Sequence, residues 1–306
     1  MRRIVFLLVG LVLAGAIAVT VMDSGKAPPP EHGGTTADRL SNDRMAKMVE
    51  GPIKLVEKKD MAGASRLFEA DLAKASAKGG MHAADLLTAY GIELRRSEHK
   101  RESIPYLRRA IDAYRTAAPG RPELALALSN YGHALLLDNP DNPPPDVLSA
   151  LREALQLREK TLGRGNAETA VNYVQLGRAE GLPVFSGRDP AKVAQAAEKI
   201  RTGIRLLPDA PNGDPNDLQD ARLQLALLYA RNGDTPAAFK AAGDYLATNP
   251  GFGAYRLRQV AVVFEKAGDT ATGRRLRDTY GIPDESTDDE DTATPTIKNA
   301  GKLTQD

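Results

Sequence analysis

The side chains that most often catalyse reactions or bind metals are sparse in this sequence. Its 306 residues include four histidines and no cysteine or tryptophan. The histidines are His32, His82, His99 and His133. No two of them have the i, i+4 spacing that places a pair of metal ligands on one helix face. The lack of cysteine excludes disulfides, thiolate nucleophiles and iron–sulfur clusters. We therefore expect no metal and no cofactor.

Three polar stretches have compositions that could bind phosphate or calcium. Gly163-Arg164-Gly165 lacks the third glycine and the Lys-Ser/Thr pair of a phosphate-binding loop. Residues 138–146 and 209–217 are rich in Asp and Asn, but calcium loops need ligands at alternate positions around a glycine bend. The first stretch has prolines instead, and the second has the wrong spacing. We expect turns and helix caps at all three places.

Basic residues cluster between positions 95 and 121, where few acids oppose them. They are Arg95, Arg96, Lys100, Arg101, Arg108, Arg109, Arg115 and Arg121. One interpretation is a solvated helix face with ion pairs along it. The other is a docking surface for an acidic partner, anionic lipid headgroups or the chain's own acidic end. Nucleic acid is not expected, because the net charge is only +1 and no aromatic residues interleave the basic ones.

The two ends of the chain differ in composition from its middle. Arg2 and Arg3 precede an uncharged apolar run over residues 4–22, so residues 1–22 are expected to be a cleaved signal peptide or a retained signal anchor. Both alternatives predict an exported protein of the periplasm or cell envelope, either free or tethered to the membrane through residues 4–22. Residues 23–42 have the composition of a flexible linker, and residues 283–306 that of an acidic disordered tail.

Between the ends, Ala and Leu dominate while β-branched and aromatic residues are scarce, which favours helices. Residues 223–250 carry a large-small pair at Leu225-Ala226, the turn Asn232-Gly233-Asp234, a small residue at Ala238 and a proline at Pro250. The same pattern recurs 35 residues further on, with Ala267-Gly268-Asp269 at the turn. Gly233 suits a left-handed helix end, and Asp234 suits the cap of the next helix.

This pattern resembles the tetratricopeptide repeat, a helix–turn–helix unit of about 34 residues. Upstream, "AYGIEL" (89–94), "NYGHAL" (130–135) and "QLGRAE" (175–180) resemble its first helix, and "YLRRAI" (106–111), "ALREAL" (150–155) and "KIRTGI" (199–204) its second. Residues 151–170 are similar to the longer repeats of kinesin-light-chain-like proteins, although Asn166 and Ala167 replace the usual His and Pro. The resemblance implies an all-α fold over residues 43–282, a right-handed superhelix of about six helix–turn–helix units.

Such a superhelix would hold a peptide or partner segment in a concave, solvent-filled groove lined by the first helix of each unit. The residues expected to line that groove are Asp85, Thr88, Arg95, Ser129, Asn130, His133, Gln175, Arg178, Gln224 and Arg231. The carboxylate clamp of chaperone adaptors is not reproduced, because Thr88, Ile92, Val171 and Gln175 replace its Lys, Asn and Arg residues.

The sequence therefore predicts a non-catalytic scaffold that binds a protein or peptide. The main alternative is an enzyme or enzyme subunit with an active site in a groove pocket, which would bring together two ionisable groups with perturbed pKa values. A structural spacer without a groove ligand is a third interpretation.

Overall fold

The computed structural model describes residues 41–210, 213–249 and 253–283. This part of the chain is 82% helix and contains no strand. Its helices are α1 (Asn42–Met48), α2 (Glu50–Glu57), α3 (Met61–Ala77), α4 (Gly80–Arg96), α5 (Lys100–Ala117), α6 (Pro122–Asp138), α7 (Asp146–Leu162), α8 (Ala167–Glu180), α9 (Pro183–Ser186), α10 (Pro190–Leu206), the 3-10 helix η2 (Leu207–Asp209), α11 (Pro215–Arg231), α12 (Thr235–Thr248), α13 (Gly253–Lys266) and α14 (Thr270–Tyr280). The all-α prediction is confirmed. The expected signal segment 1–22 and nearly all of the expected linker and tail lie outside the described residues.

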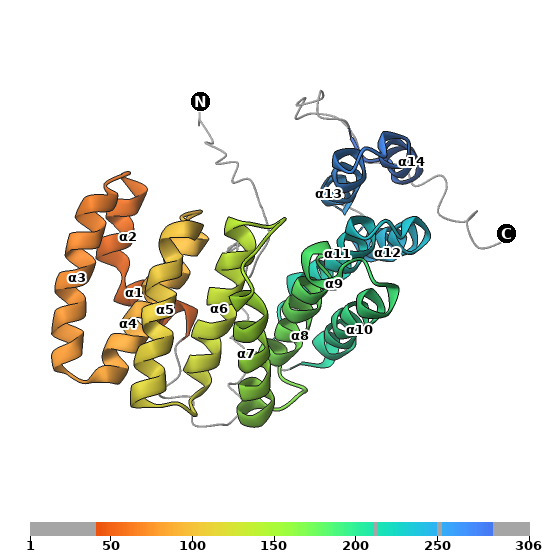
Figure 1. Cartoon of the computed structure of the whole chain (residues 1–306). Coiled ribbons are helices and arrows are strands. Elements are labelled where there is room, and N and C mark those ends of the chain that lie inside the picture. Colours follow the sequence, from red (N-terminus) through yellow and green to blue (C-terminus); the bar gives the residue numbers. More distant parts are fainter. Residues whose placement is uncertain (1–40, 211–212, 250–252, 284–306) are drawn as a thin grey trace, which may run out of the picture.

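The helices pack against their neighbours in chain order. In the described ranges the helices can be grouped into six packed pairs: α2 with α3, α4 with α5, α6 with α7, α8 with α10, α11 with α12, and α13 with α14. Successive pairs also pack on each other, as α5 does on α6. Figure 1 shows the pairs following one another from α2 and α3 at one end to α13 and α14 at the other. The helices of the first pairs are seen from the side, whereas α11–α14 are seen closer to end-on. The direction of the helix axes therefore changes along the array.

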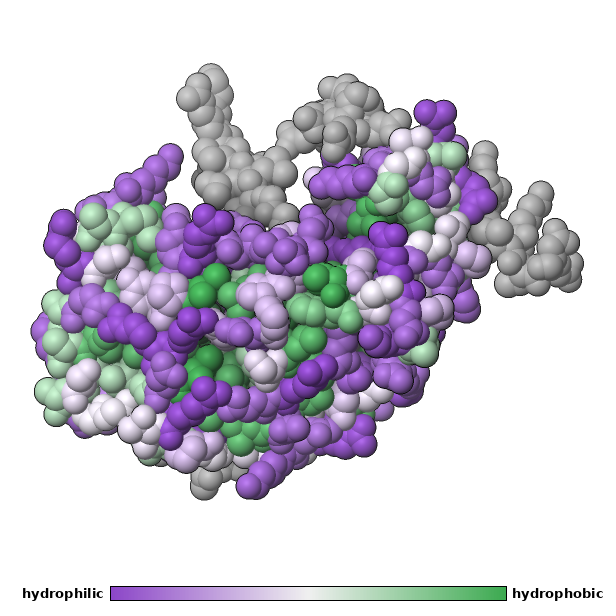
Figure 2. Space-filling view, viewed as in Figure 1, coloured by the Kyte–Doolittle hydropathy of each residue, from purple (hydrophilic) through white to green (hydrophobic). Residues whose placement is uncertain are grey.

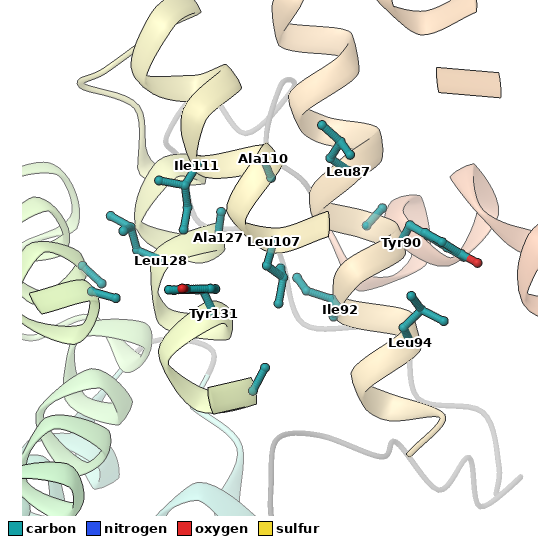
Figure 3. Packing of buried hydrophobic residues seen from close by; sticks show 14 of the residues in the cluster. Leu87, Tyr90, Ile92, Leu94, Leu107, Ala110, Ile111, Ala127, Leu128 and Tyr131 are labelled. Atoms are coloured by element: carbon teal, nitrogen blue, oxygen red, sulfur yellow. The ribbon is translucent and has the colours of Figure 1, made fainter. Parts of the chain in front are cut away.

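The buried apolar side chains form two clusters that meet at α8. The larger cluster extends from α1 to α7 and includes Leu176 and Ala179 of α8. The smaller extends from α10 to α14 and includes Ala170 and Val174 of α8. Figure 3 shows the larger cluster where α4, α5 and α6 meet, with Leu107 of α5 lying between its neighbours. Each pair thus completes its core against the next one.

A close contact between a glycine on the first helix and an aliphatic side chain on the second recurs in three pairs. A Cβ added to Gly91 would lie 2.6 Å from the Leu107 Cγ, and one added to Gly132 would lie 2.8 Å from the Leu151 Cγ. The third instance joins Gly177 of α8 to Ile200 of α10. A Cβ at any of these places would force a facing atom to shift, because real Cβ atoms do not approach other heavy atoms so closely.

The turns inside the pairs also share a conformation. Lys59, Glu98, Gly233 and Gly268 all have positive φ, between 64° and 89°. In each case the next residue donates its backbone N–H to the carbonyl oxygen five residues before it, as Asp234 does to Tyr229 at 3.0 Å. The expected roles of Gly233 and Asp234 are confirmed, since Asp234 also accepts a hydrogen bond from the Ala237 N–H.

The surface of the described residues is mainly polar. Figure 2 shows hydrophilic side chains over most of one face, with hydrophobic side chains in separate patches. No described helix is both long and apolar enough to cross a bilayer. The apolar run over residues 4–22 falls outside that search.

Candidate binding site

The ten residues expected to line a groove all lie on α4, α6, α8 and α11, the first helices of four successive pairs. These helices also contact each other, α4 with α6, α6 with α8, and α8 with α11. The side chains are more enclosed than a solvent-filled groove would make them. The buried ones are Asp85, Thr88, Arg95, Ser129, His133, Arg178 and Gln224. Asn130, Gln175 and Arg231 are partly exposed.

Several of these side chains bind to other parts of the fold. The Tyr114 hydroxyl of α5 donates to Asp85 Oδ1 at 2.6 Å, and burial raises the pKa of both groups. The Ser129 hydroxyl donates to Gln175 Oε1 at 2.7 Å and so joins α6 to α8. The Thr88 hydroxyl donates to the Ala84 carbonyl oxygen within α4. These contacts assign Asp85, Thr88 and Ser129 to the interior of the fold.

Four cationic or basic side chains remain, one on each of the four first helices. They are Arg95 of α4, His133 of α6, Arg178 of α8 and Arg231 of α11, and we call them the inner basic row. Burial lowers the pKa of His133, and the positive charges of Arg95 and Arg178 lower it further. Burial, followed by the charge of Arg231, lowers the pKa of Arg178 to about 10. His133 and Arg178 therefore feel the positive charges of other members of the row, and His133 is held neutral.

The arginines of the inner basic row have no carboxylate partner within 4 Å in the described part of the chain. Arg95 Nη2 donates to the neutral Asn130 Oδ1 at 3.1 Å. Burial lowers the pKa of Arg95 to about 10. The Nε atoms of Arg95 and Arg178 are buried without a hydrogen-bond partner, as are both amide atoms of Gln224. A buried charge without a directly paired carboxylate is costly to the fold.

The other basic residues between 95 and 121 behave differently. Every one except Arg95 has a carboxylate within 4 Å: Arg96–Glu93, Lys100–Glu98, Arg101–Asp138, Arg108–Asp146, Arg109–Glu69, Arg115–Glu153 and Arg121–Glu123. Most of these pairs join neighbouring helices rather than successive turns of one helix. The interpretation as a paired, solvated face thus holds for seven residues of the run.

A buried polar network lies at the junction of α6, α7 and α8, and the sequence alone did not predict it. Arg158 Nη1 donates to Asn172 Oδ1 at 3.0 Å and to the Glu168 carbonyl oxygen at 3.1 Å. It also lies 3.3 Å from the Ser129 hydroxyl. The only sequence signal was a basic residue on the buried side of the second helix. These contacts hold the Arg158 guanidinium inside the fold.

The polar stretches form turns and caps, as expected. Asn139 Oδ1 accepts from the Asn142 N–H at 3.2 Å, and Asp214 Oδ1 caps α11 by accepting from the Asn216 N–H at 2.8 Å. Gly163 ends α7 with a φ of 80°.

No group of three or more potential His, Cys, Asp or Glu ligands converges in the described ranges. A recess between α13 and α14 contains the ion pair of Arg277 with Glu265, 2.9 Å apart.

No protein-family model matches this sequence, and no curated protein is significantly similar to it. The features that point to a function are therefore those of the chain itself. The most distinctive is the inner basic row, in which Arg95, His133 and Arg178 are buried.

Proposed function

We propose that this chain is a tetratricopeptide-like scaffold whose first helices together hold a segment of a partner protein. The helix pairs would form a right-handed superhelix, and the segment would lie along the face that carries the inner basic row. The N-terminal residues 4–22 would act as an export signal or membrane anchor, which would place the scaffold in the periplasm or cell envelope.

Two repeated features support the helical-repeat part of the proposal. The glycine–aliphatic contact recurs at Gly91, Gly132 and Gly177, and the positive-φ turn recurs at four places from Lys59 to Gly268. Recurring contacts of this kind are expected when similar units stack in one direction. The change in helix direction along the array in Figure 1 is in keeping with a superhelix.

The observation that carries the binding part is the placement of Arg95, His133, Arg178 and Arg231 on four successive first helices. Side chains on successive stacked helices can form an extended surface, and extended surfaces of solenoids suit elongated ligands. The Nε atoms of Arg95 and Arg178 have no hydrogen-bond partner among the described residues, so the fold leaves part of their hydrogen-bonding capacity unused.

The test is site-specific photocrosslinking in cells that produce the full chain. A photoreactive phenylalanine analogue replaces Gln175, which is partly exposed on α8. The matched control replaces Gln195, which is exposed on the second helix α10. We expect discrete crosslinked products from position 175, mapping to one segment of a partner, and none of these from position 195. Identical products from both positions, or none from position 175 in a folded variant, would contradict the proposal.

A further inference from the structure

The last helix pair has an open recess on one side of α14. The residues that line it are Glu265, Thr270, Arg274, Arg277, Asp278, Gly281 and Ile282. Elsewhere α14 packs on α12, where the Tyr280 hydroxyl donates to the Phe239 carbonyl oxygen at 2.7 Å. In stacked repeats each pair is covered by the next one, and no further pair follows α14 in the described ranges. The recess is therefore a surface that the described fold leaves uncovered.

The chain leaves the described fold at the rim of this recess. Ile282 lines the recess, and the Pro283 carbonyl oxygen accepts a hydrogen bond from Arg277 Nη1 at 3.1 Å. Residues 284–306 follow and lie outside the described residues. Eight extended residues span at most about 28 Å. Helix α14 has 11 residues and is therefore about 16 Å long. Residues 284–291 can thus reach back along the whole of α14.

The charges of the last pair and of the segment that follows it are opposite. Residues 253–283 contain six Arg and Lys residues and three Asp and Glu residues, so their net charge is +3. Residues 284–291 contain six acids and no basic residue. Because the two segments are joined, their encounter is intramolecular, and even a weak attraction is populated at the high effective concentration that the tether gives.

Arg274 is the cation of the recess to which the described fold gives no acid. It is exposed, and no carboxylate lies within 4 Å of it in the described ranges. Arg277, by contrast, pairs with Glu265 at 2.9 Å. The neighbouring Arg275 lies over the Phe239 ring of α12, with its guanidinium carbon 4.6 Å from the ring centroid. Asp278 also lines the recess, and its negative charge opposes an acidic ligand there.

We propose that the acidic residues 284–291 fold back along α14 and cover the recess between α13 and α14, with Arg274 as their main charged contact. The segment gives the last pair the cover that each earlier pair receives from the next one. The proposal does not depend on the scaffold function, because it concerns the end of the array and not the first helices. The contact weakens as salt rises, because charges exposed to solvent are screened over about 8 Å at physiological ionic strength.

The test is fluorescence quenching within the purified full chain, which has no Cys and no Trp of its own. A bimane label on Thr292→Cys reports the end of the acidic run, and Thr270→Trp places a quencher in the recess. The matched control is Ala271→Trp, since Ala271 is exposed beside Thr270 and does not line the recess. We expect Thr270→Trp to reduce the bimane emission by about half or more at low salt, because the tether keeps the tail close. Ala271→Trp should reduce it much less. The quenching should disappear near 1 M salt, where the screening length is about 3 Å.

Substitutions of charged residues test the role given to Arg274. Arg274→Gln should reduce the quenching several-fold, whereas Arg275→Gln, with the same change in charge one residue further on, should leave it unchanged. Replacement of all six acids of residues 284–291 by Asn and Gln should abolish it. Asp278→Asn should strengthen it, because a negative charge that opposes the tail is removed.

Three results would overturn the proposal. The first is equal quenching by Thr270→Trp and Ala271→Trp, or quenching that survives the replacement of the six acids, because the tether alone would then explain it. The second is no quenching in a chain whose circular dichroism shows intact helices. The third is quenching between a labelled chain and a separate tryptophan-bearing chain, which would assign the contact to a second copy. If Thr270→Trp does not fold, Asp278→Trp places the quencher in the same recess.

Discussion

Gly177 of α8 packs so closely on α10 that a Cβ at this position would lie 2.8 Å from the Ile200 Cγ1 atom. It would also lie 2.6 Å from the Ala196 carbonyl oxygen. The equivalent contact of Gly132 is less constrained. There the nearest atoms belong to the flexible Leu151 side chain, and the nearest backbone oxygen is 3.5 Å away. A side chain can rotate away from a new methyl group, whereas a helix backbone must shift as a whole.

Gly177→Ala should therefore destabilise the protein more than Gly132→Ala. Overpacking costs about 1–3 kcal/mol, and replacing a helical glycine by alanine returns about 0.5–1 kcal/mol. We expect a net loss of about 2 kcal/mol for Gly177→Ala and about 1 kcal/mol or less for Gly132→Ala. Urea unfolding followed by circular dichroism measures both. The control is Gly120→Ala, where nothing lies within 4 Å of the added Cβ and no stability should be lost. Equal losses at 132 and 177 would contradict the role assigned to the α10 backbone.

Lys59→Gly should stabilise the protein. Lys59 has a φ of 64° and no ion pair among the described contacts, and its turn matches the one at Gly233. The left-handed conformation costs an L-residue about 1–2 kcal/mol, and the extra chain entropy of glycine offsets part of this. We expect a net gain of about 0.5–1 kcal/mol in thermal or urea unfolding. Lys58→Gly is the matched control, because Lys58 has a φ of −80° and should gain nothing. A gain of the same size at position 58 would show that conformational strain at Lys59 is not the cause.

Two of these four turns have a clear signal in the sequence, and two have none. Gly233-Asp234 and Gly268-Asp269 were predicted as turns because glycine accepts positive φ and aspartate caps the following helix. Lys59 and Glu98 adopt the same conformation without that signal. At these two positions, packing of the helices on either side determines the backbone and overrides local preference. The all-α fold and the places of the second helices could thus be predicted, but the complete set of turns could not.

The helices that carry the candidate site could be predicted from the sequence, but the burial of its side chains could not. The large-Gly pairs placed Arg95, His133 and Arg178 on first helices, and the structure does the same. Their burial depends on how adjacent helices pack, which a helical pattern does not specify. The ion pairs also could not be predicted from a local sequence pattern, because partners such as Arg109 and Glu69 are 40 residues apart. Only the positions of whole helices decide which arginines find a carboxylate.

Asp217, in the first turn of α11, gives the fold a pH-dependent stability. Burial, and after it the negative charges of the nearby Asp214 and Asp220, raise the pKa of its carboxyl group from 3.8 to about 6. The unfolded chain loses this proton near its ordinary pKa, whereas the folded chain keeps it until about pH 6. The contribution of Asp217 to stability is therefore lost as pH rises from about 4 to about 6, and it stays lost above that range.

Asp217→Asn should remove this dependence, because an amide does not ionise. The pKa shift corresponds to about 3 kcal/mol, which solvent screening of the partly exposed carboxylate reduces to about 1–2 kcal/mol. We expect the variant to match the parent near pH 4 and to be more stable by about that amount near pH 7.5, in urea unfolding across this range. The control is Asp209→Asn, because Asp209 is exposed in η2 and its replacement should change the stability little. If the stability difference for Asp217→Asn is the same at pH 4 and pH 7.5, the carboxyl group of Asp217 does not retain its proton in the folded chain.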